Sequence, residues 1–463
     1  MANEWEFVKL GDLAAVRSGY AFKSKDWTDY GIPVVKIANV KDGRLEMGGC
    51  SYVSSEVAAA ASEFNLNTGD ILIAMTGYIG DIARVKANDL PCVLNQRVGL
   101  FSIKHQTRLH DGYLFYFLRS TETRKTIEGL GYGSAQPNVS PSLIHNVEVP
   151  LPPLKEQQAI ACILGALDDK IELNRRMNRT LEATARAIFK SWFVDFDPVL
   201  DNALVSERPI PESMRERVAR RLEAIASRSQ RPGSLNRPLP APIADLFPDA
   251  FEESELDVIP KGWRVGKVGD LAEINGWTLS KRDHLDEIDY IEISEVMRGE
   301  IANITRYARG CEPGRARRRL RHGDTAISTV RPDRRSYFLS IEPSPNLIAS
   351  TGFAVLTAKA ERWAFVHVLT TRDEFGLDLG RLADGGAYPA VRPEVIGARP
   401  AVVPAEEQVM SAFEDVAQPM LLRADAARKE SHTLAAVRDA LLPKLISGEL
   451  QVPDAERIVG RCV

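Results

Sequence analysis

The chain has 463 residues, too many for one typical domain, and this length predicts two to four domains. Hydrophobic residues make up 44% and charged residues 26%, as in globular proteins that bury a core, and the formal net charge of −4 argues against a protein that coats nucleic acid indiscriminately. The five cysteines form no CxxC pair, which argues against a disulfide framework or a cysteine zinc site and fits a cytoplasmic location. The N-terminus, MANEWEFVKLGDL, lacks a basic start and an apolar core, and the apolar runs elsewhere are strand-sized, so we expect neither a signal peptide nor a membrane span.

The second half of the chain repeats the first half. Five stretches recur in the same order at a nearly constant separation, and the small drift in that separation is what loop deletions produce. The matches pair Trp5 with Trp263, Ile32 with Ile288, Gly69-Asp70 with Gly323-Asp324, Pro137 with Pro389, and Glu156-Gln157 with Glu407-Gln408. We therefore predict a two-copy tandem duplication.

Each copy begins with short β-branched segments that glycine, aspartate and asparagine interrupt, such as VVKIANV and DILIAM in the first copy. A helical segment follows, LHDGYLFYFLRSTETRKTI in the first copy and RWAFVHVLTTRDEFGLDL in the second, and then a polar glycine loop leads to a last strand that ends at prolines. The pattern predicts an α+β fold with two similar α/β globules of ordinary domain size.

A long helix is predicted after each globule, with apolar residues spaced alternately three and four apart, as in a coiled-coil seam. At ~1.5 Å per residue each helix would be roughly 55 Å long. The predicted pairing residues are Ile160, Leu164, Leu167, Ile171, Met177, Leu181 and Ile188 in the first helix, and Val409, Phe413, Val416, Leu434, Val437 and Leu441 in the second.

Antiparallel pairing of these two helices would make them a spacer between globules related by a pseudo-two-fold axis. The alternative is that each helix packs on its own globule. Pro419 lies near the middle of the second helix and is expected to kink or break it.

These patterns divide the chain into six parts. The expected boundaries are 1–153 for the first globule, 154–198 for the first spacer helix, 199–258 for a linker with one short helix near 212–224, 259–404 for the second globule, 405–450 for the second spacer helix, and 451–463 for a C-terminal tail.

No catalytic motif is found in the sequence. It contains neither a Walker-type loop nor HExxH, and DFDPV lacks the second proline and the aromatic residue of an amino-methyltransferase loop. The acidic run PDAFEESELD lies in the predicted linker without a nearby lysine, so a solvated tether explains it better than a metal nuclease. We expect neither a catalytic residue nor a metal ligand in this chain.

Polar loops that follow the strands carry side chains suited to phosphates and base edges. They occur in both copies with different side chains, which favours two different reading surfaces on one scaffold over ordinary surface turns. The candidate DNA-binding residues are Lys23, Lys25, Thr76, Tyr78, Asn95, Gln96, Arg97, Tyr132, Ser134, Gln136 and Asn138 in the first copy, and Ser280, Lys281, Arg282, Arg331, Arg334, Arg335, Tyr388 and Arg392 in the second. The basic run RARRRLRHGD, Arg315–Asp324, is open to two interpretations: a phosphate clamp, or a solubilising or partner-docking strand edge.

The whole layout resembles the specificity subunit of type I restriction-modification systems. The resemblance rests on the segment from PLPPLKEQQAIACILGALDD to FKSWFVDFDPV, on LFPDAFEESELDVIPKGW, on STVRP and on LLPKLISGEL. It implies that the globules are target recognition domains for a bipartite double-stranded DNA site and that the helices set the gap between the half-sites. It also implies that two methyltransferase subunits and motor-nuclease (restriction) subunits dock on this chain.

In such a complex the chain itself is expected to bind no cofactor, and S-adenosylmethionine, ATP and Mg²⁺ are expected on the partner subunits. The chain would not be catalytic alone but would direct adenine methylation or restriction. Two other classes remain open. A stand-alone DNA-modifying enzyme would transfer methyl groups as the purified chain, and a coiled-coil scaffold without a DNA role would show no sequence-selective binding.

Overall fold

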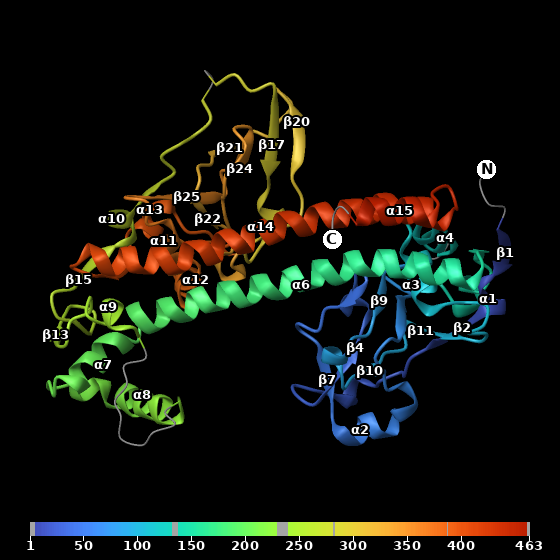
Figure 1. Cartoon of the computed structure of the whole chain (residues 1–463), viewed down its shortest axis with the longest axis horizontal. Helices are drawn as coiled ribbons and strands as arrows, with labels where there is room; N and C mark the ends of the chain where they lie inside the picture. Colours follow the sequence, from blue (N-terminus) through green and yellow to red (C-terminus); the bar gives the residue numbers. More distant parts are fainter. Residues whose placement is uncertain (1–4, 132–137, 229–238, 281–282, 387, 461–463) are drawn as a thin grey trace. The chain divides into compact units, whose positions relative to one another are not determined.

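The computed structural model describes residues 5–131, 138–228, 239–280, 283–386 and 388–460. The chain forms two compact units, and each of them combines segments that are distant in sequence. Unit 1 contains Met1–Asn174 and Lys429–Val463, and unit 2 contains Arg175–Arg428. The two 40-residue helices, α6 (Leu154–Phe193) and α14 (Glu407–Ile446), therefore each contribute to both units (Figure 1).

Unit 1 has two four-stranded sheets and two small strand pairs. The first sheet has the order β2-β11-β8-β9, with the bounds Ala14–Ser18, Val98–Ile103, Ile71–Ala74 and Ile82–Arg84. The second has the order β10-β4-β7-β3, with the bounds Val93–Leu94, Ile32–Val35, Ser51–Val53 and Trp27–Thr28. The pairs are β1 (Glu6–Lys9) with β12 (Glu148–Leu151), and β5 (Val40–Lys41) with β6 (Arg44–Leu45). The helices besides α6 and α14 are α1 (Leu10–Leu13), α2 (Ser55–Ala60), α3 (Asp111–Arg119), α4 (Thr121–Leu130), α5 (Pro141–Ile144) and α15 (Val452–Val459).

Unit 2 repeats this architecture, with one strand of its second sheet in a different position. Its first sheet has the order β16-β25-β22-β23, with the bounds Ala272–Ile274, Phe353–Ala358, Thr325–Ser328 and Tyr337–Leu339. Its second sheet has the order β20-β17-β24-β21, with the bounds Thr305–Ala308, Glu287–Ile291, Leu347–Ser350 and Ala316–Arg319. The pairs are β15 (Arg264–Lys267) with β26 (Pro400–Val403), and β18 (Val296–Met297) with β19 (Glu300–Ile301). The corresponding helices are α10 (Val268–Leu271), α11 (Trp363–Thr371), α12 (Asp373–Arg381) and α13 (Pro393–Gly397).

The predicted α+β fold and the duplication are thus confirmed. The second sheets also show how the copies diverged. They share a parallel pair, β4 with β10 or β17 with β24, and an antiparallel neighbour, β7 or β20. The fourth strand differs, because β3 extends the sheet beyond β7 in unit 1, whereas β21 extends it beyond β24 in unit 2.

The helices run antiparallel within each unit. In unit 1, Asp168 of α6 contacts Arg438 of α14 at 2.6 Å, and Asn174 contacts Glu430 at 2.9 Å. In unit 2, Glu182 contacts Arg428 at 2.8 Å, and the rings of Phe189 and Phe413 lie 5.6 Å apart. As the number on α6 rises, the number on α14 falls, which defines antiparallel pairing.

Each helix also packs on its own globule, so the two arrangements expected as alternatives occur together. Gln157, at the start of α6, is fully buried, accepts a hydrogen bond from the His110 backbone N–H and donates one to the Arg108 carbonyl. At the start of α14, Gln408 is exposed. Two turns further on, Glu414 accepts hydrogen bonds from the Ala364 and Phe365 N–H groups in the first turn of α11. The repeated Glu-Gln motif therefore marks both helix starts but carries the contact in only one.

At several positions of the two helices, the buried residue is the one next to the predicted pairing residue. Most predicted pairing residues are buried, but Met177, Leu181, Ile188, Val416 and Val437 are only partly buried. Their buried neighbours are Asn178, Phe189, Ala417 and Arg438. Both helices face a globule as well as each other, so the stripe is wider than a two-stranded seam, and polar residues occupy it.

Helix α14 continues through Pro419 without a break, so a break at this proline is wrong. The proline removes the hydrogen bond that the Asp415 carbonyl would accept, but Pro419 lies on the exposed face, where water can replace it. On the other face, Phe413, Ala417 and Leu421 are buried in the core of unit 2 and hold the helix in place.

The segment expected as a linker is largely folded. It contains α7 (Asp197–Val205), α8 (Arg215–Arg228), α9 (Ala241–Ala244) and the hairpin of β13 (Phe251–Glu253) with β14 (Val258–Pro260). The buried Asn202 amide donates to the carbonyls of Ala244 and Phe247, and Phe247 packs in the aromatic core beside Trp192. The high proline and charge content suggested a solvated tether, but buried residues such as Leu200, Asn202 and Phe247 pack the segment into unit 2.

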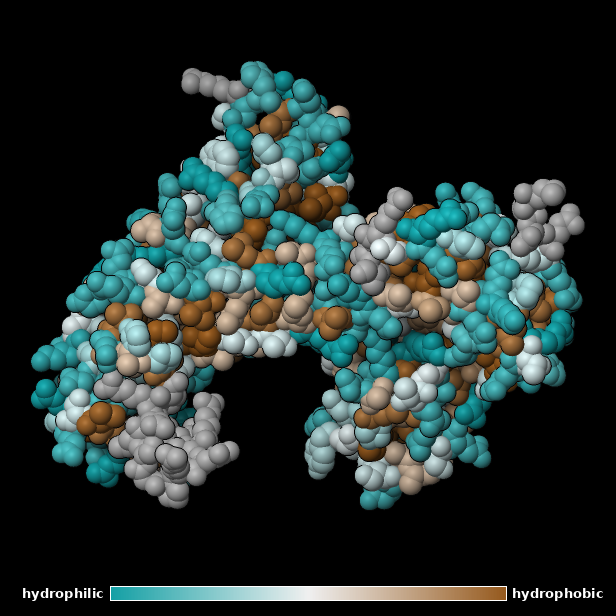
Figure 2. Space-filling view, in the orientation of Figure 1, coloured by the Kyte–Doolittle hydropathy of each residue, from teal (hydrophilic) through white to brown (hydrophobic). Residues whose placement is uncertain are grey.

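No helix in the described part of the chain is long and apolar enough to cross a membrane. The visible face of the molecule is mostly hydrophilic, with hydrophobic residues in separate patches (Figure 2).

Candidate nucleic-acid interface

Four of the predicted DNA-binding residues of unit 1 meet in one cleft. Thr76 follows β8, Gln96 and Arg97 lie between β10 and β11, and Asn138 precedes α5, and all four line a cleft of about 650 Å³. A bridge between Thr76 and Asn138 and the hydrogen bond from the Met75 N–H to the Arg97 carbonyl (3.1 Å) join these loops. Three loops distant in sequence thus form one polar surface.

The side chains of this cleft suit nucleic-acid contacts. Gln96, Arg97 and Asn138 are exposed. Glutamine and asparagine side chains can pair bidentately with adenine, arginine can pair bidentately with guanine, and all three can bind phosphates. The Thr76 hydroxyl is buried and has no hydrogen-bond partner among the described residues. Ser18, Ile37 and Ser140 also line the cleft and were missed from the sequence, because nothing in their local pattern indicates that the fold brings them there.

The other candidates of unit 1 have different roles or positions. Asn95 is buried, and its side-chain oxygen accepts from the Arg97 N–H, so it shapes the loop. Tyr78, Lys23 and Lys25 are exposed but do not line the cleft. Tyr132, Ser134 and Gln136 lie outside the described residues.

An aromatic row lies beside Lys23 and Lys25 in the sequence. The rings of Tyr20 and Phe22 are 4.9 Å apart, those of Phe22 and Trp27 are 5.6 Å apart, and Lys36 Nζ lies 3.8 Å from the centre of the Trp27 ring. Burial lowers the pKa of Lys36, and its ammonium donates to Ser51 at 2.6 Å. Alternating cationic and aromatic residues in YAFKSKDW could have indicated this row from the sequence.

The matching loops of unit 2 form a second, more basic surface. Val330 and Ala390 make the same bridge as Thr76 and Asn138, and the Arg331 N–H donates to the Pro389 carbonyl at 2.7 Å. The Arg331 guanidinium lies 4.6 Å from the centre of the Tyr388 ring, which is 71% exposed. This pairing places a cation beside an exposed aromatic ring at the position where unit 1 has two exposed amides and the exposed Arg97.

The remaining candidates of unit 2 divide in the same way. Arg334 and Arg392 are exposed near this surface in sequence, whereas Arg335 forms an ion pair with Asp373 and is mostly buried. Ser280 is exposed, and its N–H donates to Asp283. Lys281 and Arg282 lie outside the described residues.

The basic run forms the edge strand β21 and is mostly used within the unit. Arg319 pairs with Asp283 at 2.9 Å and lies 4.2 Å from the centre of the Trp277 ring, while Arg321 lies 5.0 Å from that ring. Burial lowers the pKa of Arg318. These contacts favour the strand-edge interpretation over a clamp that would use every arginine on phosphate.

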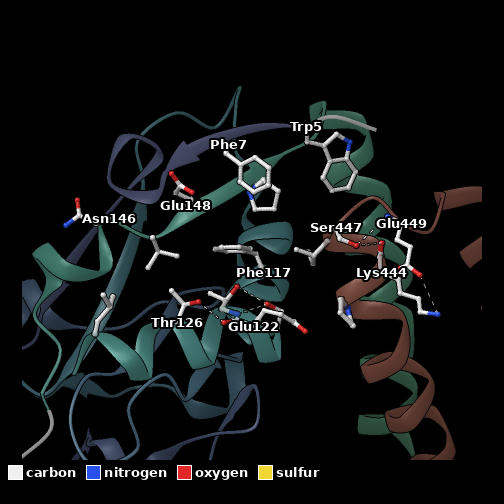
Figure 3. A pocket seen from close by; sticks show the side chains of 17 residues that line it. Trp5, Phe7, Phe117, Glu122, Thr126, Asn146, Glu148, Lys444, Ser447 and Glu449 are labelled. Atoms are coloured by element: carbon white, nitrogen blue, oxygen red, sulfur yellow. Dashed lines mark hydrogen bonds and ion pairs between the residues drawn. The ribbon is translucent and has the colours of Figure 1, made fainter. Parts of the chain in front are cut away.

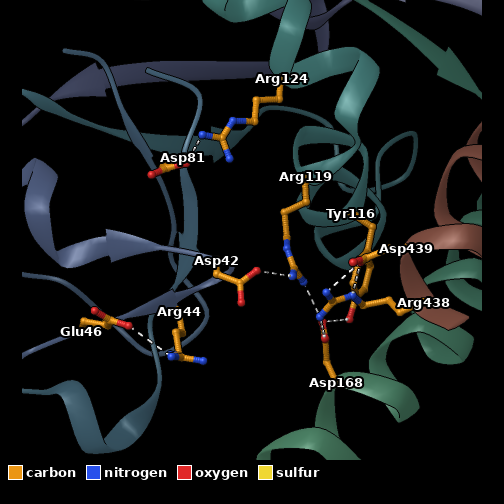
Figure 4. A network of polar contacts seen from close by, with 10 residues as sticks. All are labelled: Asp42, Arg44, Glu46, Asp81, Tyr116, Arg119, Arg124, Asp168, Arg438 and Asp439. Carbon is orange, nitrogen blue, oxygen red and sulfur yellow. Dashed lines mark hydrogen bonds and ion pairs between the residues drawn. The ribbon is translucent and has the colours of Figure 1, made fainter. Parts of the chain in front are cut away.

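A polar network fastens the unit 1 globule to both helices (Figure 4). Asp168 of α6 accepts from Arg119 at 2.7 Å, from Arg438 of α14 at 2.6 Å and from the Tyr116 hydroxyl at 2.9 Å. Burial alone would raise the pKa of Asp168, but the charges of Arg119 and Arg438 and their hydrogen bonds outweigh it and hold the pKa below its usual value. The Arg119 guanidinium also forms an ion pair with the Asp42 carboxylate at 3.6 Å. Because Asp42 lies in the turn between β5 and β6, the network includes this strand pair.

Among the described residues, no group of three or more histidine, cysteine, aspartate or glutamate side chains could hold a metal ion. The fold and the candidate interface thus define a duplicated protein with two polar loop surfaces, one on each unit, and a pair of long antiparallel helices.

Comparisons with known proteins point to type I restriction enzyme specificity subunits. Residues 2–183 match the family model described as the type I restriction modification DNA specificity domain. The chain is 23% identical to the type I restriction enzyme MjaIX specificity subunit of Methanocaldococcus jannaschii, over 98% of this chain and 95% of that protein. It is 24% identical to the HindI specificity subunit of Haemophilus influenzae, over 73% of this chain and 77% of that protein.

A third relative, the MjaVIII specificity subunit of Methanocaldococcus jannaschii, is 32% identical, over 40% of this chain and 44% of that protein. The crystal structure of the type I restriction-modification S subunit from M. genitalium has a similar fold, with a TM-score of 0.52 and 16% identity over 96% of both chains. The chain is thus similar to type I restriction-modification specificity subunits, and this similarity supports DNA sequence recognition.

Proposed function

We propose that this chain reads a bipartite DNA target and positions methyltransferase subunits on it without catalysing a reaction itself. One half-site is read by the unit 1 cleft with Thr76, Gln96, Arg97 and Asn138, and the other by the unit 2 surface around Arg331 and Tyr388. The observation that carries the proposal is the repetition of one loop junction with different side chains, Thr76–Asn138 and Val330–Ala390. A shared scaffold with different contact residues is what two different half-sites require.

The paired helices serve in this proposal as the spacer between half-sites. At ~1.5 Å per residue, a helix of 40 residues is about 60 Å long, which accommodates half-sites one or more duplex turns apart. The contacts of Asp168 in unit 1 and of Glu182 in unit 2 connect the helices, so a change in pairing register would change the gap.

The proposed complex is cytoplasmic and contains two methyltransferase subunits, with motor-nuclease subunits for restriction. S-adenosylmethionine, ATP and Mg²⁺ belong to those partners in the proposal. The motif resemblance stated from the sequence supports this assignment, as do the relatives, which are themselves specificity subunits.

Mapping methylated adenines in the DNA of cells that carry this gene with its neighbouring methyltransferase gene tests the proposal. The expected result is a bipartite motif that disappears when this gene is deleted. Unchanged methylation after deletion would contradict the proposal. Methyl transfer by the purified chain alone would instead favour an enzyme with built-in recognition.

A further inference from the structure

Unit 1 contains a groove of about 1220 Å³ that the proposed DNA contacts do not use (Figure 3). It lies between the β1–β12 pair, helices α3 and α4, and the C-terminal end of α14. Phe117 and Ile446 are buried in its floor, while Trp5 is partly exposed and Phe7 is 65% exposed. The groove thus gathers apolar side chains from β1, α3 and α14 in one hollow.

The duplication shows how the same surface is treated in unit 2. Strand pairing matches Phe7 and Pro150 with Val265 and Val402, so Trp5 corresponds to Trp263. Trp263 is only 5% exposed, because the rings of Phe193, Phe196 and Phe247 lie 5.9, 5.8 and 6.4 Å from it.

Phe193 ends α6 and Phe196 immediately precedes α7, and the third covering ring, Phe247, comes from the folded segment between the copies. The contacts of Asn202 hold Phe247, and the Lys261 N–H donates to the Ala250 carbonyl next to it. In unit 1, α15 follows the spacer helix as α7 does in unit 2, but among the described residues of unit 1 no segment corresponds to α9 and the β13–β14 hairpin. The groove is therefore the position at which unit 2 has its own covering segment.

The charged residues around the groove indicate which charge a segment that covers it should carry. Glu122 and Glu148 are exposed on opposite sides, and their carboxylates have no ion-pair partner among the described residues. On the third side, the Lys444 ammonium lies 4.0 Å from the Glu449 carboxylate, so their charges compensate each other. A cover for this groove needs an apolar anchor and basic flanks, unlike the acidic segment that covers unit 2.

We propose that this groove docks a segment of a partner protein that presents an aromatic or large aliphatic side chain between basic residues. The anchor packs on Phe7, Trp5 and Ile446, and the basic flanks pair with Glu122 and Glu148. The site is separate from the candidate DNA contacts, so the inference does not depend on the DNA-reading role.

The test uses the full chain and a labelled peptide probe. The probe has the sequence of Pro240–Pro260, which carries the covering residues Phe247 and Phe251, with its six acidic residues replaced by lysine. Fluorescence anisotropy should give a dissociation constant below about 100 µM, and the unsubstituted acidic peptide should bind at least about tenfold more weakly. The variants are Phe7→Asp and Glu122→Lys combined with Glu148→Lys, each of which should weaken binding by about tenfold or more.

The matched control is Tyr30→Asp, which changes an 84% exposed aromatic residue outside the groove and should leave binding unchanged. Circular dichroism and thermal unfolding verify that each variant is folded. The proposal is overturned if the lysine peptide fails to bind, if Phe7→Asp binds as the natural chain does, or if only the charge variant weakens binding, since that result indicates surface attraction without docking.

Discussion

Replacing Asp168 with alanine should destabilise unit 1, because one carboxylate neutralises two nearly buried arginines. The side chains of Arg119 and Arg438 are 10% and 9% exposed, and that of Asp168 is 25% exposed. Without the carboxylate, Arg119 keeps Asp42 at 3.6 Å and Arg438 keeps Asp439 at 2.8 Å, so neither guanidinium is left entirely alone. The Tyr116 hydroxyl loses its acceptor as well.

The size of the effect follows from these contacts. Breaking a buried ion pair from one side costs about 3–5 kcal/mol, and the partial exposure of Asp168 and the remaining acids reduce this to about 3 kcal/mol. For a unit of about 200 residues, 3 kcal/mol corresponds to a fall in melting temperature of about 6–12 °C.

Differential scanning calorimetry of the Asp168→Ala variant at pH 7 measures this effect. The matched control is Glu128→Ala, which removes an exposed ion pair with Arg124 at 2.9 Å in the same unit and should cost less than about 0.5 kcal/mol. If both variants melt within about 2 °C of the natural chain, the network does not stabilise unit 1 and the reasoning is refuted. The double variant Asp168→Ala, Arg438→Ala should lose less stability than the two single changes combined, because their effects are coupled.

Four other predictions concern single side chains. Because the folded-state pKa of Asp168 lies below its unfolded value, its contribution is present above about pH 4 and lost as the pH falls further, so denaturant titrations of Asp168→Ala should show a weaker acid dependence than the natural chain. Glu414→Ala leaves the N–H groups of Ala364 and Phe365 without an acceptor and should lower the unfolding free energy of unit 2 by about 2–3 kcal/mol. Glu414→Gln keeps an acceptor oxygen and should cost less. Equal losses of stability in urea unfolding would contradict the hydrogen-bond account. Phe189→Ala should cost about 3–5 kcal/mol, because the ring is 1% exposed among three other phenylalanines, and a cost within about 0.5 kcal/mol of an exposed control, Leu377→Ala, would refute that packing. Arg97→Ala should weaken binding of the assembled complex to its target by about 1–3 kcal/mol, and an unchanged affinity in a gel-shift titration would remove this residue from the interface.

The duplication, the α+β class and the two long helices could be predicted from the sequence, because they depend on local patterns repeated in both copies. Trp5 and Trp263 immediately precede equivalent strands, β1 and β15, and the apolar spacing from Ile160 to Ile171 is that of a buried helix face. The packing of the segment 199–258 could not be predicted, because it depends on a few residues such as Asn202 and Phe247 that contact distant elements.

The candidate interface could be predicted only in part. Loop composition identified Gln96 and Arg97, but it could not separate them from Asn95, which is buried, or from Arg335, whose charge pairs with Asp373. Tertiary contacts decide whether a polar loop residue faces solvent, and the sequence alone does not contain them. The register of the helix seam depended on tertiary contacts for the same reason, since Arg438 occupies a buried position where it pairs with Asp168 of the other helix.

The central claim is that each unit reads one half of a bipartite DNA site. The most direct test replaces residues 1–153 with the corresponding globule of a related specificity subunit and maps methylated adenines in cells that also carry the methyltransferase gene. The account predicts that one half of the motif changes, while the other half and the gap between them stay the same. A motif that changes in both halves, or in neither, would contradict it.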